Sequence, residues 1–68
     1  MYVTQIDRYT VEIERIDAMN YWVIVTDDDG AEVAAEEKEL PQAWANLPEA
    51  EIGRRLAEEA PVPATAGE

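Results

Sequence analysis

The stretch that decides the fold is residues 9–36, which read YTVEIERI, DAMN, YWVIVT, DDDG and AEVAAE in succession. Residues 9–16 alternate, so that Val11 and Ile13 share one face and Glu12 and Glu14 the other. Asp and Asn side chains satisfy turn backbone and Gly readily adopts a positive φ, so DAMN and DDDG predict turns. We therefore expect three consecutive antiparallel strands joined by two turns.

The segment 21–26 is apolar on both faces, with Tyr21, Val23 and Val25 on one and Trp22 and Ile24 on the other. This pattern predicts a central strand that is buried on both sides. Each apolar face needs a cover, and a single helix covers only one. The second cover would be the segment 40–47 or another subunit.

The flanking segments predict edge strands. Residues 31–36 are rich in Ala and Glu, and charge at a sheet edge discourages edge-to-edge pairing. Residues 1–8 contain Tyr2, Val3 and Ile6, which either extend the first strand or form a separate edge piece. The alternation of residues 9–16 does not continue back to Ile6, so we expect a bulge or break near Asp7 and Arg8.

The apolar period changes after Lys38, which predicts helix in place of strand. Residues 40–45 predict a short helix with Pro41 in its first turn. A second helix should begin with Asn46 as its N-cap, carry Pro48 in its first turn and end at Pro61.

In that second helix Ile52 and Leu56 lie one turn apart on the same face. Gly53 costs a helix about 1 kcal/mol relative to Ala, and close approach to the sheet would explain its presence. Three oppositely charged pairs are spaced for contact on the outer surface. These pairs are Glu51 with Arg55, Arg54 with Glu58, and Arg55 with Glu59.

The expected fold class is α+β: a three- or four-stranded antiparallel sheet with a C-terminal helix packed on one face. Residues 1–60 form the single domain, and residues 61–68, rich in Pro and Ala, predict a disordered tail. Without Cys or His, the chain has no disulfide and lacks the usual zinc ligands. A domain this small is marginally stable, so unusually good packing or a homodimer is expected.

The net charge of −11 is concentrated in residues 27–39, which hold seven acidic residues and one Lys. Phosphate binding needs clustered Lys and Arg, so direct binding to nucleic acid or to an anionic membrane is disfavoured. The same Coulomb argument favours a basic protein partner. The alternative is that the acidity only keeps a small domain in solution. No membrane span or signal peptide is recognised, and a cytoplasmic location is expected.

Catalysis and metal binding find little support in the sequence. The chain has no His, Cys or Ser, so the usual nucleophilic triads are missing, and we expect a non-enzymatic protein without a cofactor. If Gly30 takes the sixth place of a calcium loop, then Asp27, Asp29 and Glu36 fall at ligand places, but Val25 stands where an acid is needed. A hairpin turn explains DDDG better than a metal site does.

The candidate partner-binding site is a row of carboxylates. Glu12 and Glu14 are expected about 6.6–6.8 Å apart on one strand face. Such a row would occupy a basic groove built for phosphates and displace nucleic acid. The full set of candidate residues is Glu12, Glu14, Asp27, Asp28, Asp29, Glu32, Glu36 and Glu37.

Residues 9–52 resemble the N-terminal module of HicB-type antitoxins. The resemblance lies in the second strand, the turn after it and the start of the helix. Its matching residues are Tyr21, Trp22, Val25, Asp27, Gly30, Leu40, Ala43 and Asn46. The turn has Thr26 and Asp29 where the family has Pro and Pro-Gly elements, and Pro48 interrupts the helix. In size and charge alone the chain is also similar to small acidic phage proteins of the anti-CRISPR type.

Together these features predict an acidic inhibitor that mimics nucleic acid. Its partner would be a basic nucleic-acid-binding protein or nuclease complex, as for an antitoxin or an anti-CRISPR protein. The alternative is a structural or assembly module, phage or host, that acts through its aromatic sheet face as a homodimer or protein contact.

Overall fold

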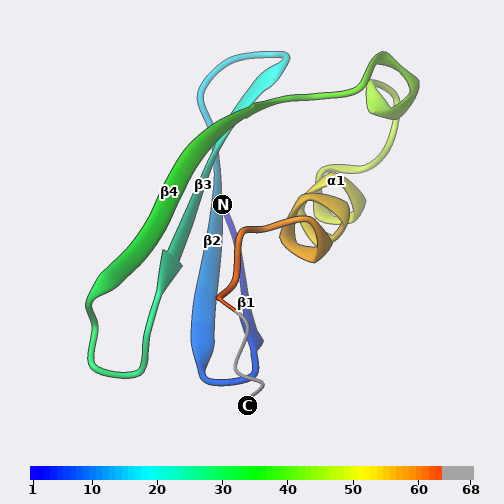
Figure 1. Cartoon of the computed structure of the whole chain (residues 1–68). Helices are drawn as coiled ribbons and strands as arrows, with labels where there is room; N and C mark the ends of the chain where they lie inside the picture. The colour runs from blue at the N-terminus through cyan, green and yellow to red at the C-terminus, as the bar shows by residue number, and fades with distance from the viewer. Residues whose placement is uncertain (64–68) are drawn as a thin grey trace.

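The computed structural model describes residues 1–63, which form one antiparallel sheet with a helix on one side (Figure 1). The strands are β1 (Tyr2–Ile6), β2 (Tyr9–Arg15), β3 (Asn20–Thr26) and β4 (Glu32–Glu39). A 3-10 helix η1 (Gln42–Trp44) and the α-helix α1 (Glu49–Glu58) follow. The strands lie in the order β1-β2-β3-β4, so each pairs with its neighbours in sequence. The predicted α+β class is confirmed. The tail predicted at 61–68 falls largely on residues 64–68, outside the described residues.

The core lies between the sheet and α1. Alternate residues of β2 and β3 point toward the helix, because successive side chains of a strand leave opposite faces. Ile52, Leu56 and Ala57 of α1 pack against them. The buried sheet residues are Tyr9, Val11, Ile13, Tyr21, Val23 and Val25.

The first hairpin turns at Asp7 and Arg8. Ile6 pairs with Tyr9 across this two-residue turn. Asp7 has a φ of 56°, a left-handed conformation that Asp tolerates better than most residues. The expected break between residues 1–8 and the next strand is therefore present, and the N-terminal residues form a separate edge strand.

The two other turns of the sheet are stabilised by Asp side chains. Asp17 Oδ1 accepts hydrogen bonds from the backbone N–H groups of Met19 and Asn20, both at 2.9 Å. These bonds lower the pKa of Asp17, with further contributions from the Asn20 side chain and Arg15. Asp27 plays the same role in the third turn, described below. Both turns lie where the Asp and Asn residues predict them.

β4 is longer than predicted. It runs to Glu39, whereas the sequence pattern ended this strand at Glu36 and placed the change to a helical period after Lys38. The register shifts between Val25 and Thr26, where a bulge lets Glu32 pair with Thr26 while Ala34 pairs with Val25. β4 lies at an edge of the sheet, as the Ala and Glu content of residues 31–36 predicts.

The connection between β4 and α1 lies on the helix side of the sheet. Leu40 is buried in the core, and Trp44 and Leu47 pack against its margin. Figure 1 shows η1 and α1 on the same side of the sheet. This segment therefore does not cover the second sheet face, and that suggested role for residues 40–47 is wrong.

α1 begins later than predicted. Pro48 holds the N-cap position and no side chain caps the helix, so the expected capping by Asn46 is wrong. The chain between Trp44 and Leu47 is instead held by a backbone hydrogen bond of 3.1 Å. The helix ends at Glu58, before Pro61.

Gly53 permits a close approach, as expected. A Cβ at this position would lie 2.6 Å from both Cβ and Cγ of Tyr2, which is closer than side chains tolerate. The backbone of α1 thus rests directly on the edge strand β1. Because β1 is tied to the helix at this point, the N-terminal strand belongs to the folded unit.

Candidate functional site

The sheet has a second face that no element among residues 1–63 covers. We call it the outer face. It is formed by the residues that alternate with the core residues, and the register aligns them across the strands. The outer face comprises Val3, Gln5, Thr10, Glu12, Glu14, Asn20, Trp22, Ile24, Thr26, Ala35, Glu37 and Glu39, and Glu32 lies beside its end at the bulge, opposite Thr26.

Two rows of the outer face combine apolar and acidic side chains. In one row Trp22 of β3 stands between Glu14 of β2 and Glu37 of β4. In the next row Glu12 stands between Val3 and Ile24. Val3 is 53% exposed, whereas Trp22 and Ile24 are half-buried by their neighbours. The face is thus an apolar strip crossed by carboxylates.

Apart from Glu32 at the bulge, the outer face carries four glutamates, and it has no basic residue. None of the four, at positions 12, 14, 37 and 39, takes part in an ion pair with another residue of 1–63. Their charges are therefore not neutralised within the described chain. These charges create a negative electrostatic potential that attracts cations, and neighbouring glutamates add to one another's potential.

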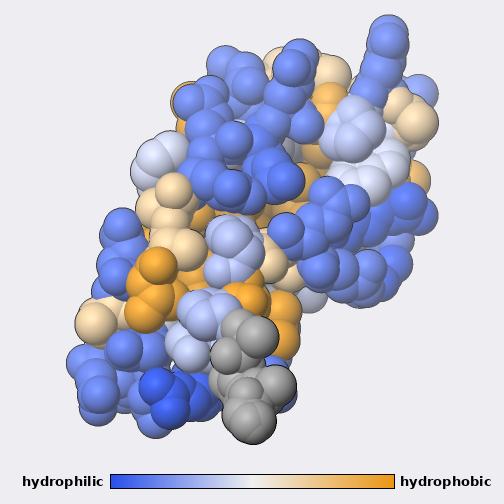
Figure 2. Space-filling model, viewed as in Figure 1, coloured by the Kyte–Doolittle hydropathy of each residue, from blue (hydrophilic) through white to orange (hydrophobic). Residues whose placement is uncertain are grey.

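The basic residues lie elsewhere and are engaged. Arg15 is 3.7 Å from Glu49, and Lys38 is 3.5 Å from Glu36. Arg8, in the first turn, reaches Asp28 at 4.0 Å. Arg54 and Arg55 pair with acids of α1. In Figure 2 hydrophilic residues cover the helix and the upper sheet, and hydrophobic residues reach the surface between them.

The helix acids show what such pairing does to a carboxylate. Glu51 accepts hydrogen bonds from Arg54, at 2.5 Å, and from Arg55, at 2.8 Å. These bonds lower the pKa of Glu51 to about 2 and raise that of Arg54. Arg54 also reaches Glu58 at 2.6 Å. Two of the three predicted helix pairs are thus present, and the pair of Arg55 with Glu59 is not among the ion pairs of residues 1–63.

The structure divides the predicted carboxylate row. Glu12, Glu14 and Glu37 lie together on the outer face. Glu32 lies at the bulged end of β4, opposite Thr26. Glu36 pairs across the sheet with Val23, which places it on the helix side. A continuous row through Glu36 is therefore not formed.

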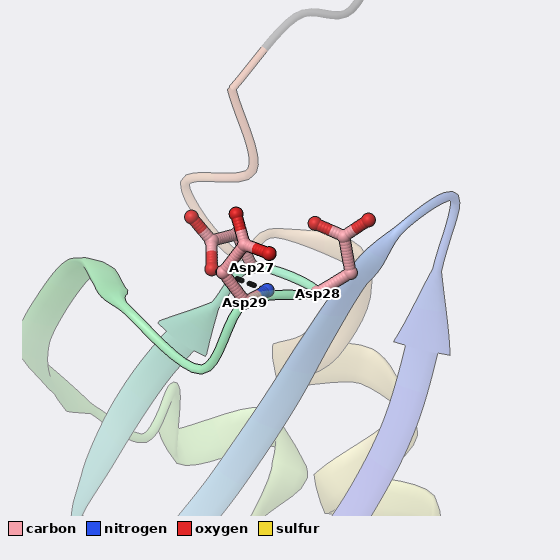
Figure 3. A group of neighbouring side chains, drawn as sticks. All are labelled: Asp27, Asp28 and Asp29. Atoms are coloured by element: carbon pink, nitrogen blue, oxygen red, sulfur yellow. Dashed lines mark hydrogen bonds between the residues drawn. The ribbon is translucent and has the colours of Figure 1, made fainter.

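The three aspartates lie in the turn between β3 and β4, beyond the last paired residues, Thr26 and Glu32. Asp27 Oδ1 accepts hydrogen bonds from the N–H groups of Asp29 and Ala31, both at 2.9 Å. Figure 3 shows the Asp27 and Asp29 carboxylates beside each other and the Asp28 carboxylate set to one side of them. Gly30 has a φ of +86°, as the turn requires.

One carboxylate oxygen from each of these aspartates lies within 4.8 Å of the others, a spacing that a metal ion could bridge. The backbone contacts of Asp27 already account for its place in the turn. Exposed acidic groups with this spacing are common without a metal, so the turn explains the cluster without a site.

Sequence reasoning missed Glu39 and the role of Trp22 in this face. Glu39 pairs with Asn20 because β4 continues past residue 36, where the pattern predicted the strand to stop. The sequence pattern places Trp22 with Ile24 on one face of a strand expected to be buried on both sides, and it leaves open which face is the core and which residues lie beside Trp22 on the neighbouring strands. The available signal was that Glu12, Glu14, Trp22 and Ile24 all alternate with core positions.

A small hollow of about 280 Å³ lies on the other side, between the start of β1 and the start of α1. Its walls are mainly apolar, and its acidic residue, Glu49, pairs with Arg15. The buried Tyr21 hydroxyl has no hydrogen-bond partner among the described residues. The residues lining the hollow are Met1, Tyr2, Ile13, Tyr21, Glu49, Ala50 and Gly53.

Comparison with protein-family models, curated proteins and solved structures finds no match to this chain. Within residues 1–63, α1 is too short and too polar to cross a membrane. The geometry of the outer face therefore carries the functional argument.

Proposed function

We propose that this chain is a non-enzymatic inhibitor that binds a cationic surface of a nucleic-acid-handling protein through its outer face. The observation that carries the proposal is the separation of charge. Four glutamates of the outer face have no ion pair within residues 1–63, while the arginines and the lysine are engaged on the helix side or in the first turn.

The spacing of the carboxylates supports mimicry of a phosphate backbone. Glu12 and Glu14 are two residues apart on one strand, about 6.6–6.8 Å by the strand rise. Adjacent phosphates of a nucleic-acid strand are separated by a comparable distance. A groove of Lys and Arg that binds phosphates would meet carboxylates at similar intervals, so occupation of that groove would exclude nucleic acid.

The same chemistry indicates two classes of partner. One is a toxin nuclease, as for an antitoxin of the HicB type, and the other is an effector that defends a host against phage, such as a CRISPR complex. Both bind nucleic acid through basic grooves. The likeness of residues 9–52 to HicB-type antitoxins supports the first, and size and charge support the second. In either setting the protein acts in the cytoplasm.

The test is competition with nucleic acid. A toxin nuclease and a CRISPR effector complex would be titrated with the chain, and displacement of labelled nucleic acid measured at increasing salt. We expect displacement that weakens as salt rises, because exposed charges are screened. If the chain displaces nucleic acid from neither the toxin nuclease nor the CRISPR complex, or if displacement does not depend on salt, the proposal is contradicted.

A matched pair of charge reversals assigns the face. Glu14→Lys with Glu37→Lys changes the outer face, and Glu58→Lys with Glu59→Lys makes the same change in net charge at the end of α1. Lysines at a helix C-terminus interact favourably with the helix dipole, so the control should fold. Only the first pair should abolish displacement. Equal losses from both pairs would mean that net charge alone is responsible.

A homodimer through the outer face is the second candidate, favoured by the exposure of Val3 and the uncovered side of Trp22. The register weighs against it. A second copy docked with its Trp22 row on that of the first would bring the carboxylates of Glu14 and Glu37 against carboxylates, and like charges in contact are unfavourable. Sedimentation at low and high salt separates the two: a stable dimer at low salt would favour this alternative.

A further inference from the structure

The two tryptophans of this protein have different surroundings. Trp44 has the guanidinium carbon of Arg55 at 5.4 Å from its ring centroid. Arg55 Nε in turn donates a hydrogen bond of 2.8 Å to Glu51. Trp44, Arg55 and Glu51 thus form a complete set in which a cation is held by an aromatic ring and by a carboxylate.

Trp22 has the ring and the carboxylates but no cation from the described residues 1–63. Glu14 and Glu37 are its direct partners on the neighbouring strands and share its face. Side chains directly opposite in an antiparallel sheet have Cβ atoms about 4.5–5.5 Å apart, so both glutamates flank the indole. Among residues 1–63 three of the four arginines stack on Tyr9, Tyr21 and Trp44, and none lies over Trp22.

We propose that Trp22, Glu14 and Glu37 receive an arginine side chain of the cationic partner. This inference rests on the proposed function and names the group that the outer face recognises. The guanidinium plane would stack on the exposed side of the indole, and its N–H groups would donate to the carboxylates on either side. Arginine fits better than lysine, because its flat, forked group combines stacking with hydrogen bonds in two directions.

The arginine must come from another protein. Arg15 stacks on Tyr21 and faces Glu49, and Arg8 stacks on Tyr9 and faces Asp28. Arg54 and Arg55 are held by Glu51 in α1. A second copy would have to break one of these pairs to supply the group. A partner with a free arginine in a phosphate-binding groove has no such cost.

The experiment uses the whole chain and two probes, an oligoarginine and an oligolysine peptide of equal length. Binding would be measured by calorimetry, and the indole N–H signals of both tryptophans followed by NMR. We expect oligoarginine to bind about tenfold more tightly than oligolysine and to shift the Trp22 signal more than the Trp44 signal. Equal affinities, or a larger shift at Trp44, would overturn the proposal.

Substitutions separate this inference from the proposed function. Trp22→Leu should remove the preference for oligoarginine, and Trp22→Phe should keep part of it because a ring remains. Glu14→Gln with Glu37→Gln should weaken the binding of both peptides. If Trp22→Leu binds like the wild-type chain while the double Gln variant is impaired, the arginine site is wrong and the acidic interface stands. If neither variant differs from wild type, both proposals fail.

Discussion

Two neighbouring rows of the sheet lie on opposite faces and carry charges of opposite sign beside an aromatic ring. On the helix side Tyr21 stands between Arg15 and Lys38, and on the outer face Trp22 stands between Glu14 and Glu37. The first row is neutralised from within the chain, since Arg15 reaches Glu49 and Lys38 reaches Glu36. The second row has no counter-charge among residues 1–63.

This difference bears on why the chain is acidic. If the acids served only to keep the protein in solution, basic and acidic residues would be interspersed over both faces. Instead the basic residues gather where the fold itself uses them. The uncovered face is left with an aromatic ring and unpaired carboxylates, a combination that suits recognition of a cation.

The largest expected effect is the difference in stability between the same substitution on the two faces of the sheet. Ile13 is 2% exposed on the helix side, whereas Ile24 is half-buried on the outer face. Ile13→Ala should lower the free energy of unfolding by about 2–5 kcal/mol, because it leaves a cavity in the core. Ile24→Ala should cost about 1 kcal/mol, since water already reaches that side chain. Urea denaturation measures both.

The two substitutions remove the same atoms, so each serves as the control for the other. Similar losses would mean that the outer face is covered in solution. A concentration-dependent midpoint for the wild-type chain that disappears in Ile24→Ala would identify a second copy as that cover.

The next effect concerns the turn between β3 and β4. There the Asp27 side chain is used by the fold and the Asp29 side chain is not, just as one sheet face is used by the core and the other is not. Asp27 accepts two backbone hydrogen bonds, and Asp29 contributes its own N–H to one of them. Asp27→Ala should destabilise the chain by about 1 kcal/mol, as loss of a turn or cap acceptor does. Asp29→Ala keeps the backbone N–H and should change stability by less than about 0.5 kcal/mol. Thermal unfolding distinguishes them, and equal losses would show that the cluster acts as a unit.

Much of the sheet could be predicted from the sequence. The alternation of residues 9–16 identified Val11 and Ile13 as core, and DDDG marked the third turn with the positive φ at Gly30. Local chemistry suffices there, because a turn needs particular residues at particular places. The close approach at Gly53 was also expected from its cost to a helix.

Other features depend on contacts distant in sequence and were not predictable. The extension of β4 to Glu39 uses residues with strong helix propensity, and only pairing with β3 keeps them in the sheet. That Gly53 meets Tyr2 requires the position of the N-terminal strand. The flanking of Trp22 by Glu14 and Glu37 likewise needs the register of three strands, which alternation alone does not fix.

A smaller effect should appear in the pH dependence of stability. The pKa of Glu51 lies at about 2 in the folded chain, below its ordinary value of 4.5, because Arg54 and Arg55 bind the ionised form. The stabilisation from Glu51 is therefore complete above pH 4.5 and is lost as the pH falls toward 2. The pair is exposed, so the effect is modest.

The measurement is the difference in melting temperature between the wild-type chain and Glu51→Gln. We expect this difference at pH 6 and its loss near pH 2, following the pKa shift. Glu59→Gln, an exposed change on the same helix, is the control. A difference that stays constant down to pH 2 would show that the Arg54 and Arg55 contacts are not formed in solution.

The smallest effect has the opposite sign and returns to the row of Trp22. Removing a helix-side acid takes away a paired charge, whereas removing Glu14 and Glu37 takes away two charges that lack counter-ions within residues 1–63. Like charges near one another on a sheet face repel, and relief of that repulsion contributes a few tenths of a kcal/mol. Glu14→Gln with Glu37→Gln should therefore raise the melting temperature slightly at low salt and not at high salt, where screening has already removed the repulsion. A loss of stability would mean that these glutamates have partners within the fold. A gain in stability together with weaker binding of cationic peptides would show that this face retains a less stable arrangement that binding requires.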